Sequence, residues 1–341
     1  MKTAFIALGL AFITLAAGCS HTGGEAKEVE LQNVSYDPTR ELWKELDRAF
    51  ETDFNAKNST TKVHVRDTAH AASGSQARSV IEGFPADVVT LAMWTDIDAI
   101  RKAGLIDADW EDRLPNRSLP YYSTIVFVVR KGNPKQIKDW PDLVRDDVGI
   151  VTPSPKTSGN GKLSFLGAWA SVTHGGGSRE DAIKFIGQLY RNVKVLDTGA
   201  RAATATFAQK NIGDVHLTWE NEALLEVRQS NGELELIYPK ISVRAEPKVA
   251  IVDANVKRNG TTEVAEAYLK HVYTPAGQEI VAKNYYRPID ADVLAKHRDV
   301  FPDVELVSIE KISGDWQKAQ DDFFSDGGVF DQVFERKEKA E

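Results

Sequence analysis

Short runs of apolar residues alternate along this chain with longer segments in which apolar positions recur at helical spacing. Val29 and Leu31 alternate with polar residues, as in a strand with one buried face. Further strands are predicted at residues 63–66, 88–91, 123–130, 149–152, 193–196, 215–218, 234–237 and 249–252. Strands separated by helices are typical of βαβ units, so the pattern predicts an α/β fold with mainly parallel sheets.

The clearest helix is predicted over residues 39–56, directly after Asp37 and Pro38, which serve as a helix cap and a first-turn proline. Its apolar positions share one face, which is expected to pack on a sheet. They are Leu42, Trp43, Leu46, Ala49, Phe50 and Phe54. Two later helices are predicted near 262–273 and 275–284. No segment has the composition of an interdomain linker, which indicates two lobes whose chain crosses between them more than once.

The composition and net charge of the chain argue against nucleic acid as a partner. The chain has 341 residues, 42% of them hydrophobic, which is enough for two cores. Its formal net charge of −8 argues against nucleic acid, whose phosphate backbone requires clustered Lys and Arg. A small anion is still compatible with an acidic surface, because backbone N–H groups at helix N-termini can bind it.

The N-terminus predicts export. Lys2 precedes an apolar run over residues 4–17, which is shorter than the roughly 20 residues of a membrane-spanning helix. Residues 15–19 resemble a bacterial lipobox, so residues 1–19 are interpreted as a signal peptide with Cys19, the only cysteine, as the lipid-modified residue. The alternative is a plain export signal. Residues 20–28 are expected to form a flexible tether and residues 335–341 a frayed tail, which leaves a lipid anchor as the sole membrane attachment.

Small and hydroxyl-bearing residues recur where strands are predicted to turn into helices, at residues 35–37, 71–75, 157–161 and 198–200. The first turn of a helix leaves about four N–H donors unpaired, and small side chains let an anion approach them. Any one of these turns is explained equally well as an ordinary cap. Together they are compatible with an oxyanion site made of donors.

Longer blocks carry a resemblance to a known family. They are SYDPTREL at 35–42, SGSQARSVIEGFPADVVTLA at 73–92, PKTSG at 155–159 and DTGARAATATFAQKNIGDVHLTWENE at 197–222. They resemble the bacterial sulfate-binding receptors of ABC importers, over about residues 29–334. The resemblance implies a periplasmic-binding-protein type II fold, in which two lobes joined by crossing hinge segments close over a tetrahedral dianion. It also implies a membrane permease and an ATPase as partners.

The same resemblance implies the lobes and the ligand contacts. Lobe 1 is expected to take residues 29–120 and part of 222–334, and lobe 2 residues 121–221 and the rest of 222–334. The expected ligand-binding residues, which act through hydroxyl or backbone N–H groups, are Ser73, Ser158, Gly159, Asn160 and Ala200.

Three further residues complete the implied site. Trp219 is expected to donate its indole N–H to the ligand; the alternative is a core aromatic residue bonded to a backbone carbonyl. Asp37 and Arg201 are expected to support the site, Asp37 at the first helix end and Arg201 paired with protein groups.

A site made only of donors favours sulfate over hydrogen phosphate, because the phosphate proton would need an acceptor. Asp37 is the exception, since a carboxylate that reached the site would be such an acceptor. The chain has Ala71 and Ala72 where relatives commonly have glycines, and Asn160 in an altered second turn. Alanine is strained if the position requires positive φ. These departures leave thiosulfate, molybdate or phosphate open as alternative ligands.

Enzyme motifs are missing from the sequence. It contains no HExxH or GxSxG motif, and its 7 histidines lack metal-ligand spacing. The sequence therefore predicts a receptor without a cofactor or metal. The remaining alternative of another class is an exported hydrolase, which would need a nucleophile and base that the sequence does not display.

Overall fold

The computed structural model describes residues 26–338, with side chains for all of these except 67–69 and 335–338. The predicted signal peptide, Cys19 and most of the tether lie outside the described residues. Strand β1 begins at Lys27, inside the predicted tether, and helix α15 runs to Glu338, past the start of the predicted frayed tail.

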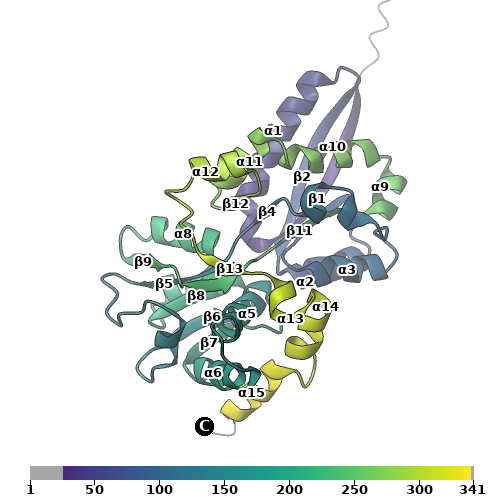
Figure 1. Cartoon of the computed structure of the whole chain (residues 1–341). Coiled ribbons are helices and arrows are strands. Elements are labelled where there is room, and N and C mark those ends of the chain that lie inside the picture. Colours follow the sequence, from purple (N-terminus) through teal and green to yellow (C-terminus); the bar gives the residue numbers. More distant parts are fainter. Residues whose placement is uncertain (1–25, 339–341) are drawn as a thin grey trace, which may run out of the picture.

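Lobe 1 is built on a four-stranded sheet of order β11-β3-β1-β2. Its strands are β1 (Lys27–Tyr36), β2 (Thr61–Ala71), β3 (Val88–Leu91) and β11 (Lys248–Ile251). The faces are covered by α1 (Arg40–Lys57), α10 (Thr262–Val272) and α11 (Pro275–Lys283) on one side and by α2 (Ser73–Ile81) and α3 (Trp94–Lys102) on the other. Figure 1 shows this lobe above the second one.

Lobe 2 is built on a five-stranded sheet of order β7-β6-β8-β5-β9. Its strands are β5 (Ile125–Arg130), β6 (Ile150–Pro153), β7 (Val193–Asp197), β8 (Val215–Trp219) and β9 (Leu234–Ile237). Helices α5 (Gly159–Thr173) and α6 (Arg179–Arg191) pack on one face, and α7 (Ala200–Thr204) and α8 (Glu220–Gln229) on the other. The described part of the chain therefore has two large sheets, each with helices packed on both faces.

The sheets are mixed, which qualifies the prediction of mainly parallel strands. Strand β1 is parallel to β2 and β3, and β6 is parallel to β7 and β8. Strands β5 and β11 are antiparallel to their neighbours. Both follow a passage of the chain from the other lobe, so no crossover helix returns them to the parallel direction.

The chain crosses between the lobes through paired segments. It leaves lobe 1 between β4 (Tyr121–Tyr122) and β5, and returns between β10 (Ile241–Val243) and β11. Ser123 and Ala245 join these two passages by backbone hydrogen bonds of 3.0 and 2.9 Å. A third passage leads from β12 (Arg287–Pro288), which pairs with β4, to β13 (Glu305–Val307), which pairs with β10. These pairings form the hinge.

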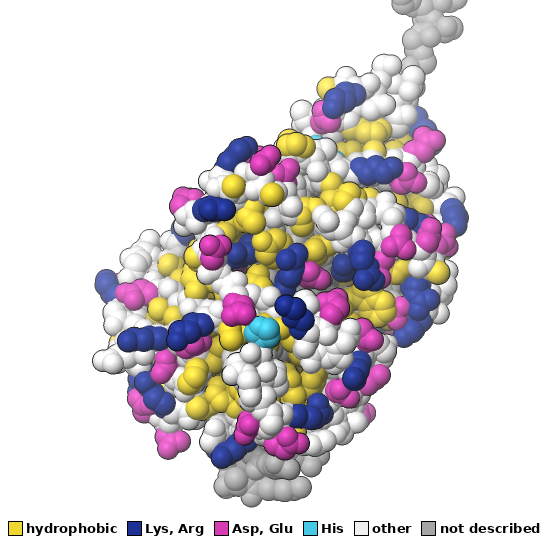
Figure 2. Space-filling model, viewed as in Figure 1, with side chains coloured by type: hydrophobic (Ala, Val, Ile, Leu, Met, Phe, Trp, Pro, Cys, Tyr) yellow, Lys and Arg dark blue, Asp and Glu magenta, His cyan; other side chains and the backbone are white. Residues whose placement is uncertain are grey.

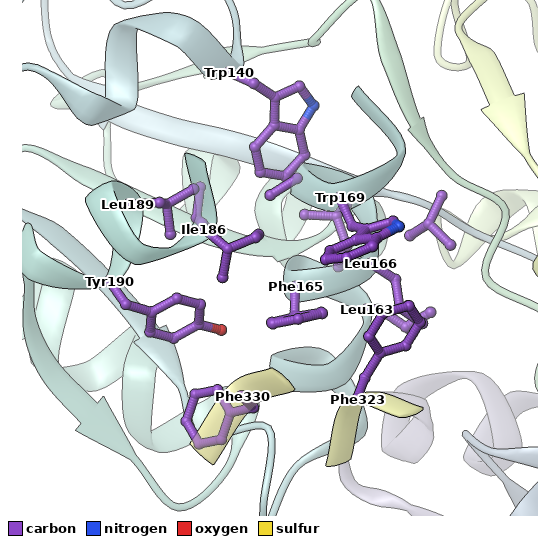
Figure 3. Close-up of a cluster of buried hydrophobic side chains, with 14 of the residues drawn as sticks. Trp140, Leu163, Phe165, Leu166, Trp169, Ile186, Leu189, Tyr190, Phe323 and Phe330 are labelled. Atoms are coloured by element: carbon purple, nitrogen blue, oxygen red, sulfur yellow. The ribbon is translucent and has the colours of Figure 1, made fainter. Parts of the chain in front are cut away.

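The C-terminal segment returns to lobe 2. In Figure 3, Phe323 and Phe330 lie beside Phe165 of α5, with ring centroids 5.5 and 6.5 Å from it. Trp169 packs against both Phe165 and Phe323, with ring centroids 6.1 and 4.7 Å away. This packing fixes α5, whose first turn faces the other lobe.

The remaining elements are short or connect those above. They are η1 (Asp37–Thr39), η2 (Trp110–Asp112), α4 (Pro115–Ser118), η3 (Trp140–Val144), η4 (Ala205–Gln209), α9 (Asp253–Asn259), α12 (Ala291–Lys296), α13 (Ile309–Ser313), α14 (Trp316–Ala319), η5 (Gln320–Phe324) and α15 (Val329–Glu338). We assign residues 309–338 to lobe 2 because their apolar side chains join its core. We assign residues 248–283 to lobe 1 for the same reason.

Candidate functional site

A cavity of about 30 Å³ lies where the two lobes meet. Its lining includes Tyr36, Pro38, Ala71, Ala72 and Ala92 from lobe 1 and Gly199 from lobe 2. It also includes Asp37, Ser73, Ser158, Gly159, Asn160, Ala200 and Trp219. The structure thus brings together the six residues named from the sequence as ligand contacts, together with Asp37. Arg201 is not among the lining residues.

On the lobe 1 side, Ser73 is the first residue of α2 and is buried. Its Oγ accepts a hydrogen bond of 3.0 Å from the Ala92 N–H, and the hydroxyl also interacts with the Asp96 carboxyl. No described residue accepts the N–H of Ser73 or Gly74. The first turn of α2 therefore offers backbone donors to the cavity.

The alanines that precede Ser73 are not strained. Ala72 has φ −57° and ψ 135°, and Ala71 lies at the end of strand β2. Neither of them is among the described residues with positive φ. The exchange of two glycines for alanines at this turn therefore carries no left-handed backbone penalty.

On the lobe 2 side, Ser158 is the N-cap of α5. Its backbone N–H donates to the Ser154 carbonyl at 3.0 Å, so this N–H is already engaged and only the hydroxyl remains for a ligand. The N–H groups of Gly159 and Asn160 have no acceptor among the described residues. The Asn160 side chain points away, with Nδ2 donating to the Leu217 carbonyl at 3.1 Å.

Two more donors come from lobe 2. Ala200 opens α7, which continues directly into η4, and its N–H has no acceptor in the described part of the chain. Trp219 ends β8 with 1% of its surface exposed and packs its ring 5.7 Å from that of Tyr36. No described residue accepts a hydrogen bond from its indole nitrogen. The nitrogen is nevertheless accessible, so a ligand in the cavity can reach it.

Gly159 sets how closely the lobes approach. A Cβ at this position would lie 3.1 Å from the Ala92 Cβ and 3.3 Å from the Met93 Sδ, both in lobe 1. These contacts are tighter than ordinary packing. The absence of a side chain at 159 therefore permits the closed arrangement of the lobes.

The supporting residues form ion pairs. Asp37 accepts from Arg40 at 3.2 Å. Arg201 donates to both carboxylate oxygens of Glu222, at 3.0 and 3.2 Å, and to those of Glu41, at 2.7 and 3.3 Å. The resemblance implies such an environment for Arg201, paired with protein groups.

The two partners of Arg201 differ in protonation. Burial raises the pKa of Glu222 to about 7, against the opposing charge of Arg201, and Glu41 and Asp37 raise it further. Burial also acts to raise the pKa of Glu41, but the hydrogen bond and charge of Arg201 outweigh it and hold this pKa below its usual value. Glu222 therefore titrates near neutral pH and Glu41 stays ionised.

Sequence reasoning missed Asp96, which lies in the first turn of α3. Burial raises the pKa of Asp96, and the Ser73 hydroxyl, Lys162 and Arg78 lower it. Ser73 thus lies between an acid of its own lobe and the cavity. Glu41 and Glu222 were also missed, because nothing in their local sequence distinguishes them from surface acids.

One larger groove carries cations that already have partners. A groove of about 810 Å³ is lined by Arg117, Arg244 and Lys248. Arg117 and Lys248 lie near Glu111, and Arg244 pairs with Glu246, so its cations are already neutralised. Figure 2 shows basic and acidic side chains interspersed over one face of the molecule, without a large patch of one sign. This groove is therefore less suited to an anion than the cavity between the lobes.

Comparison with known proteins also indicates a solute-binding protein. Bacterial extracellular solute-binding proteins match the chain over residues 34–287. The chain belongs to this family. The sulfate-binding protein of Escherichia coli K12 is 49% identical over 331 residues, which cover 96% of this chain and 98% of that protein. The thiosulfate-binding protein of Pseudomonas aeruginosa PAO1 is 49% identical over 323 residues, covering 94% and 96%.

A solved structure extends the comparison to the fold. The sulfate-binding protein SubI from Mycobacterium tuberculosis H37Rv has a TM-score of 0.77 at 32% identity, covering 87% of this chain and 100% of that one. The resemblance and the two-lobed α/β fold predicted from the sequence are confirmed. Family members are extracellular, as their description states. Among the described residues, no helix is both long and apolar enough to cross a membrane.

Proposed function

We propose that this protein is an extracytoplasmic receptor that captures sulfate and delivers it to the permease and ATPase of an ABC importer. The printed names of near full-length relatives, including a sulfate-binding protein at 49% identity, support this proposal. The observation that supports the receptor function most directly is a set of hydrogen-bond donors that have no acceptor among the described residues. They come from both lobes, at the first turns of α2, α5 and α7 and at Trp219, and they line one buried cavity.

The cavity suits a dehydrated anion because its donors are dipoles. No Lys or Arg is among its lining residues. The N-terminus of each helix carries about half a positive charge, so several of them offset a dianion without a salt bridge. Hydrogen bonds to charged groups contribute about 1.5–3 kcal/mol each, which makes such a site strong once water is excluded.

A preference for sulfate over hydrogen phosphate follows from the same set of hydrogen-bond donors. Hydrogen phosphate carries a proton that needs an acceptor, whereas sulfate needs donors only. Asp37 is the one carboxylate among the lining residues, and Arg40 engages its Oδ1. We therefore expect sulfate to bind more tightly than phosphate. The difference in affinity should be smaller if the Asp37 carboxylate can accept the phosphate proton.

Thiosulfate is the second candidate ligand. A thiosulfate-binding protein is as similar to this chain as a sulfate-binding one, at 49% identity. Thiosulfate replaces one oxygen of sulfate by a larger and weaker acceptor. We infer that the closely packed cavity accepts both and ranks sulfate first.

We infer that binding involves no catalysis. Ser35 and His70 form a pair resembling a nucleophile and base, with Oγ and Nδ1 2.9 Å apart. Ser35 is completely buried in strand β1, so no ester can reach its oxygen. Among the described residues no cluster could hold a metal ion. Turnover of a sulfate or phosphate ester by the pure protein would contradict this inference.

We also propose that the mature protein is held at the outer face of the cytoplasmic membrane by a lipid on Cys19, with a plain export signal as the alternative. The sequence at 15–19 supports this. The mass of the N-terminal peptide of the mature protein distinguishes a lipid-modified cysteine from an unmodified end.

The receptor function is tested by titrating the exhaustively dialysed protein with sulfate, thiosulfate, phosphate and molybdate. Calorimetric heat and tryptophan fluorescence are followed together. We expect saturable binding of sulfate that phosphate does not displace. Binding of molybdate or phosphate in preference to sulfate would reassign the ligand, and no response to any of the four would refute the receptor.

A further inference from the structure

A second groove, on lobe 2, is lined by cations that have no partner. It has a volume of about 430 Å³ and lies where α5 and α6 meet the C-terminal helices α13 and α14, which Figure 1 shows in yellow beside α5. Arg179 is the first residue of α6, Lys311 belongs to α13 and Lys318 belongs to α14. All three side chains line this hollow, which we call the lobe 2 groove.

The positive charge of the lobe 2 groove is not neutralised from within the protein. In the described part of the chain, none of the three cationic side chains forms an ion pair with a carboxylate. Asp322 is the one carboxylate among the lining residues. Asp181, close to Arg179 in the sequence, bonds to Ser178 instead. The groove therefore has an excess of positive charge, although the chain as a whole has a formal net charge of −8.

Arg179 is held in place by two aromatic rings. Its Cζ lies 5.4 Å from the centroid of the Trp169 ring and 5.9 Å from that of Phe323, within the range of cation–π attraction. Both rings are buried, whereas Arg179 is exposed. No described residue accepts a hydrogen bond from its guanidinium. A planar guanidinium fixed in this way can bind two oxygens of one carboxylate or phosphate.

The C-terminal helices supply the other polar groups of the groove. Lys311 and Lys318 are exposed and contribute ammonium groups, which attract an anion as point charges. Ser313 ends α13 in the wall of the groove, and its enclosed Oγ has no hydrogen-bond partner in the described structure. Enclosed hydroxyl groups are usually hydrogen-bonded, so this wall has polar capacity that the protein itself does not use.

We propose that the lobe 2 groove is a second ligand site, which binds a small molecule that carries at least two carboxylate or phosphate groups. One anionic group pairs with Arg179, and another with Lys311 and Lys318. The site differs from the cavity between the lobes, because it is larger and is lined by full charges. Its cations are exposed, so the ligand keeps part of its hydration. The proposal does not depend on the receptor function.

Citrate and pyrophosphate are suitable probes, because each carries several anionic groups. The dialysed protein is titrated with each of them by calorimetry, with and without sulfate. We expect one saturable site for each probe. Its affinity should be the same when sulfate fills the cavity between the lobes, and it should fall as the concentration of sodium chloride is raised.

The same helix supplies a matched control. Arg191 is the last residue of α6, is exposed, forms no ion pair among the described residues and does not line the groove. Arg179→Gln should weaken the binding of both probes by about tenfold, the effect of one lost hydrogen bond to a charged group. Arg191→Gln should leave it unchanged. The double substitution Lys311→Gln and Lys318→Gln should weaken it by about two- to fivefold, because exposed charges interact weakly.

The double lysine variant keeps the aromatic packing of Arg179, so it tests the groove even if Arg179→Gln unfolds. Absence of saturable binding of both probes would overturn the proposal. Equal affinities of the Arg191→Gln variant and the double lysine variant would do the same, and so would displacement of the probes by sulfate, which would place them in the cavity between the lobes. Failure of sulfate itself to bind would count against the receptor function and would leave the comparison of these variants intact.

Discussion

At the scale of single residues, the proposed site works through groups that the fold leaves without partners. Trp219 illustrates this, because its ring is buried while no described residue accepts from its indole nitrogen. Trp140 is a buried tryptophan of the other kind, with Nε1 donating to the Ile241 carbonyl at 2.7 Å. The sequence alone does not distinguish these two environments, since the acceptor of the Trp140 indole lies 101 positions away along the chain.

The substitution Trp219→Phe tests the indole contact. It removes one donor to a charged ligand while retaining most of the ring, so sulfate binding should weaken by about 1–3 kcal/mol. Trp140→Phe is the control and should lower the unfolding free energy with little change in affinity. Calorimetry and thermal unfolding of both variants give the comparison. An unchanged sulfate affinity in Trp219→Phe would exclude Trp219 as a ligand contact.

Glu222 predicts a dependence of stability on pH. Its pKa is about 7 in the folded protein because of burial, against about 4.3 in an unfolded chain. The folded state therefore holds this proton more tightly, so the contribution of Glu222 is complete below about pH 4 and is lost as the pH rises through 7.

Glu222→Gln should remove that dependence. The unfolding free energy of the unsubstituted protein minus that of the variant is expected to fall between about pH 5 and pH 8 in urea titrations. Glu45→Gln is the control, because the pairing of Glu45 with Lys283 lowers its pKa in spite of burial. Parallel pH profiles for the unsubstituted protein and Glu222→Gln would contradict the assignment.

At the scale of elements, the sequence was informative where a pattern is local. The four-residue strands β3 and β9 lie at the predicted residues, because each is a short run between turn residues. Strands β4, β10, β12 and β13 were missed, since two or three residues carry no periodicity and exist only through pairing across the hinge. The donor turns were found by composition, but the resemblance was needed to infer that they converge.

The hydrogen bonds within those turns were also beyond sequence reasoning. The Ser158 N–H was expected among the donors, and it is occupied by Ser154 instead. Arg201, Glu41 and Glu222 are separated by 160 and 21 positions, so their pairing requires the folded lobes. Contacts between elements distant in sequence account for most of what the pattern did not predict.

Gly159 at the start of α5 provides a prediction for closure. In Gly159→Ala, the new methyl group would press on Ala92 and Met93 of lobe 1, and overpacking costs about 1–3 kcal/mol. The strain exists only when the lobes are closed, so affinity should fall by that amount while the unliganded protein keeps its stability. Gly187→Ala in α6 is the control, because its Cβ would meet nothing within 4 Å. Equal affinities for the two variants would show that position 159 does not limit closure.

At the scale of the whole molecule, the lobes are separate cores tied together at one side. The C-terminal helices pack into the lobe 2 core, and α10 and α11 pack into that of lobe 1. Beside the hinge, Arg287 and Glu220 form an almost fully buried ion pair at 2.7 Å. Such a frame allows the lobes to move as units, with the proposed ligand contacts in the cavity between them.

A ligand held by both lobes should protect both at once. In hydrogen exchange measured by mass spectrometry, saturating sulfate is expected to slow exchange in the peptides that contain Ser73, Gly159 and Ala200, the first residues of α2, α5 and α7. At a free concentration about 100 times the Kd, the ligand should add about 2.7 kcal/mol to the unfolding free energy. Peptides from α9, remote from the cavity, serve as the internal control. Protection confined to α5 and α7 would mean that lobe 2 binds the anion alone and that closure is not part of capture. Equal protection at all three helix starts, lost together in Gly159→Ala, would follow if the anion is held only where both lobes contribute donors.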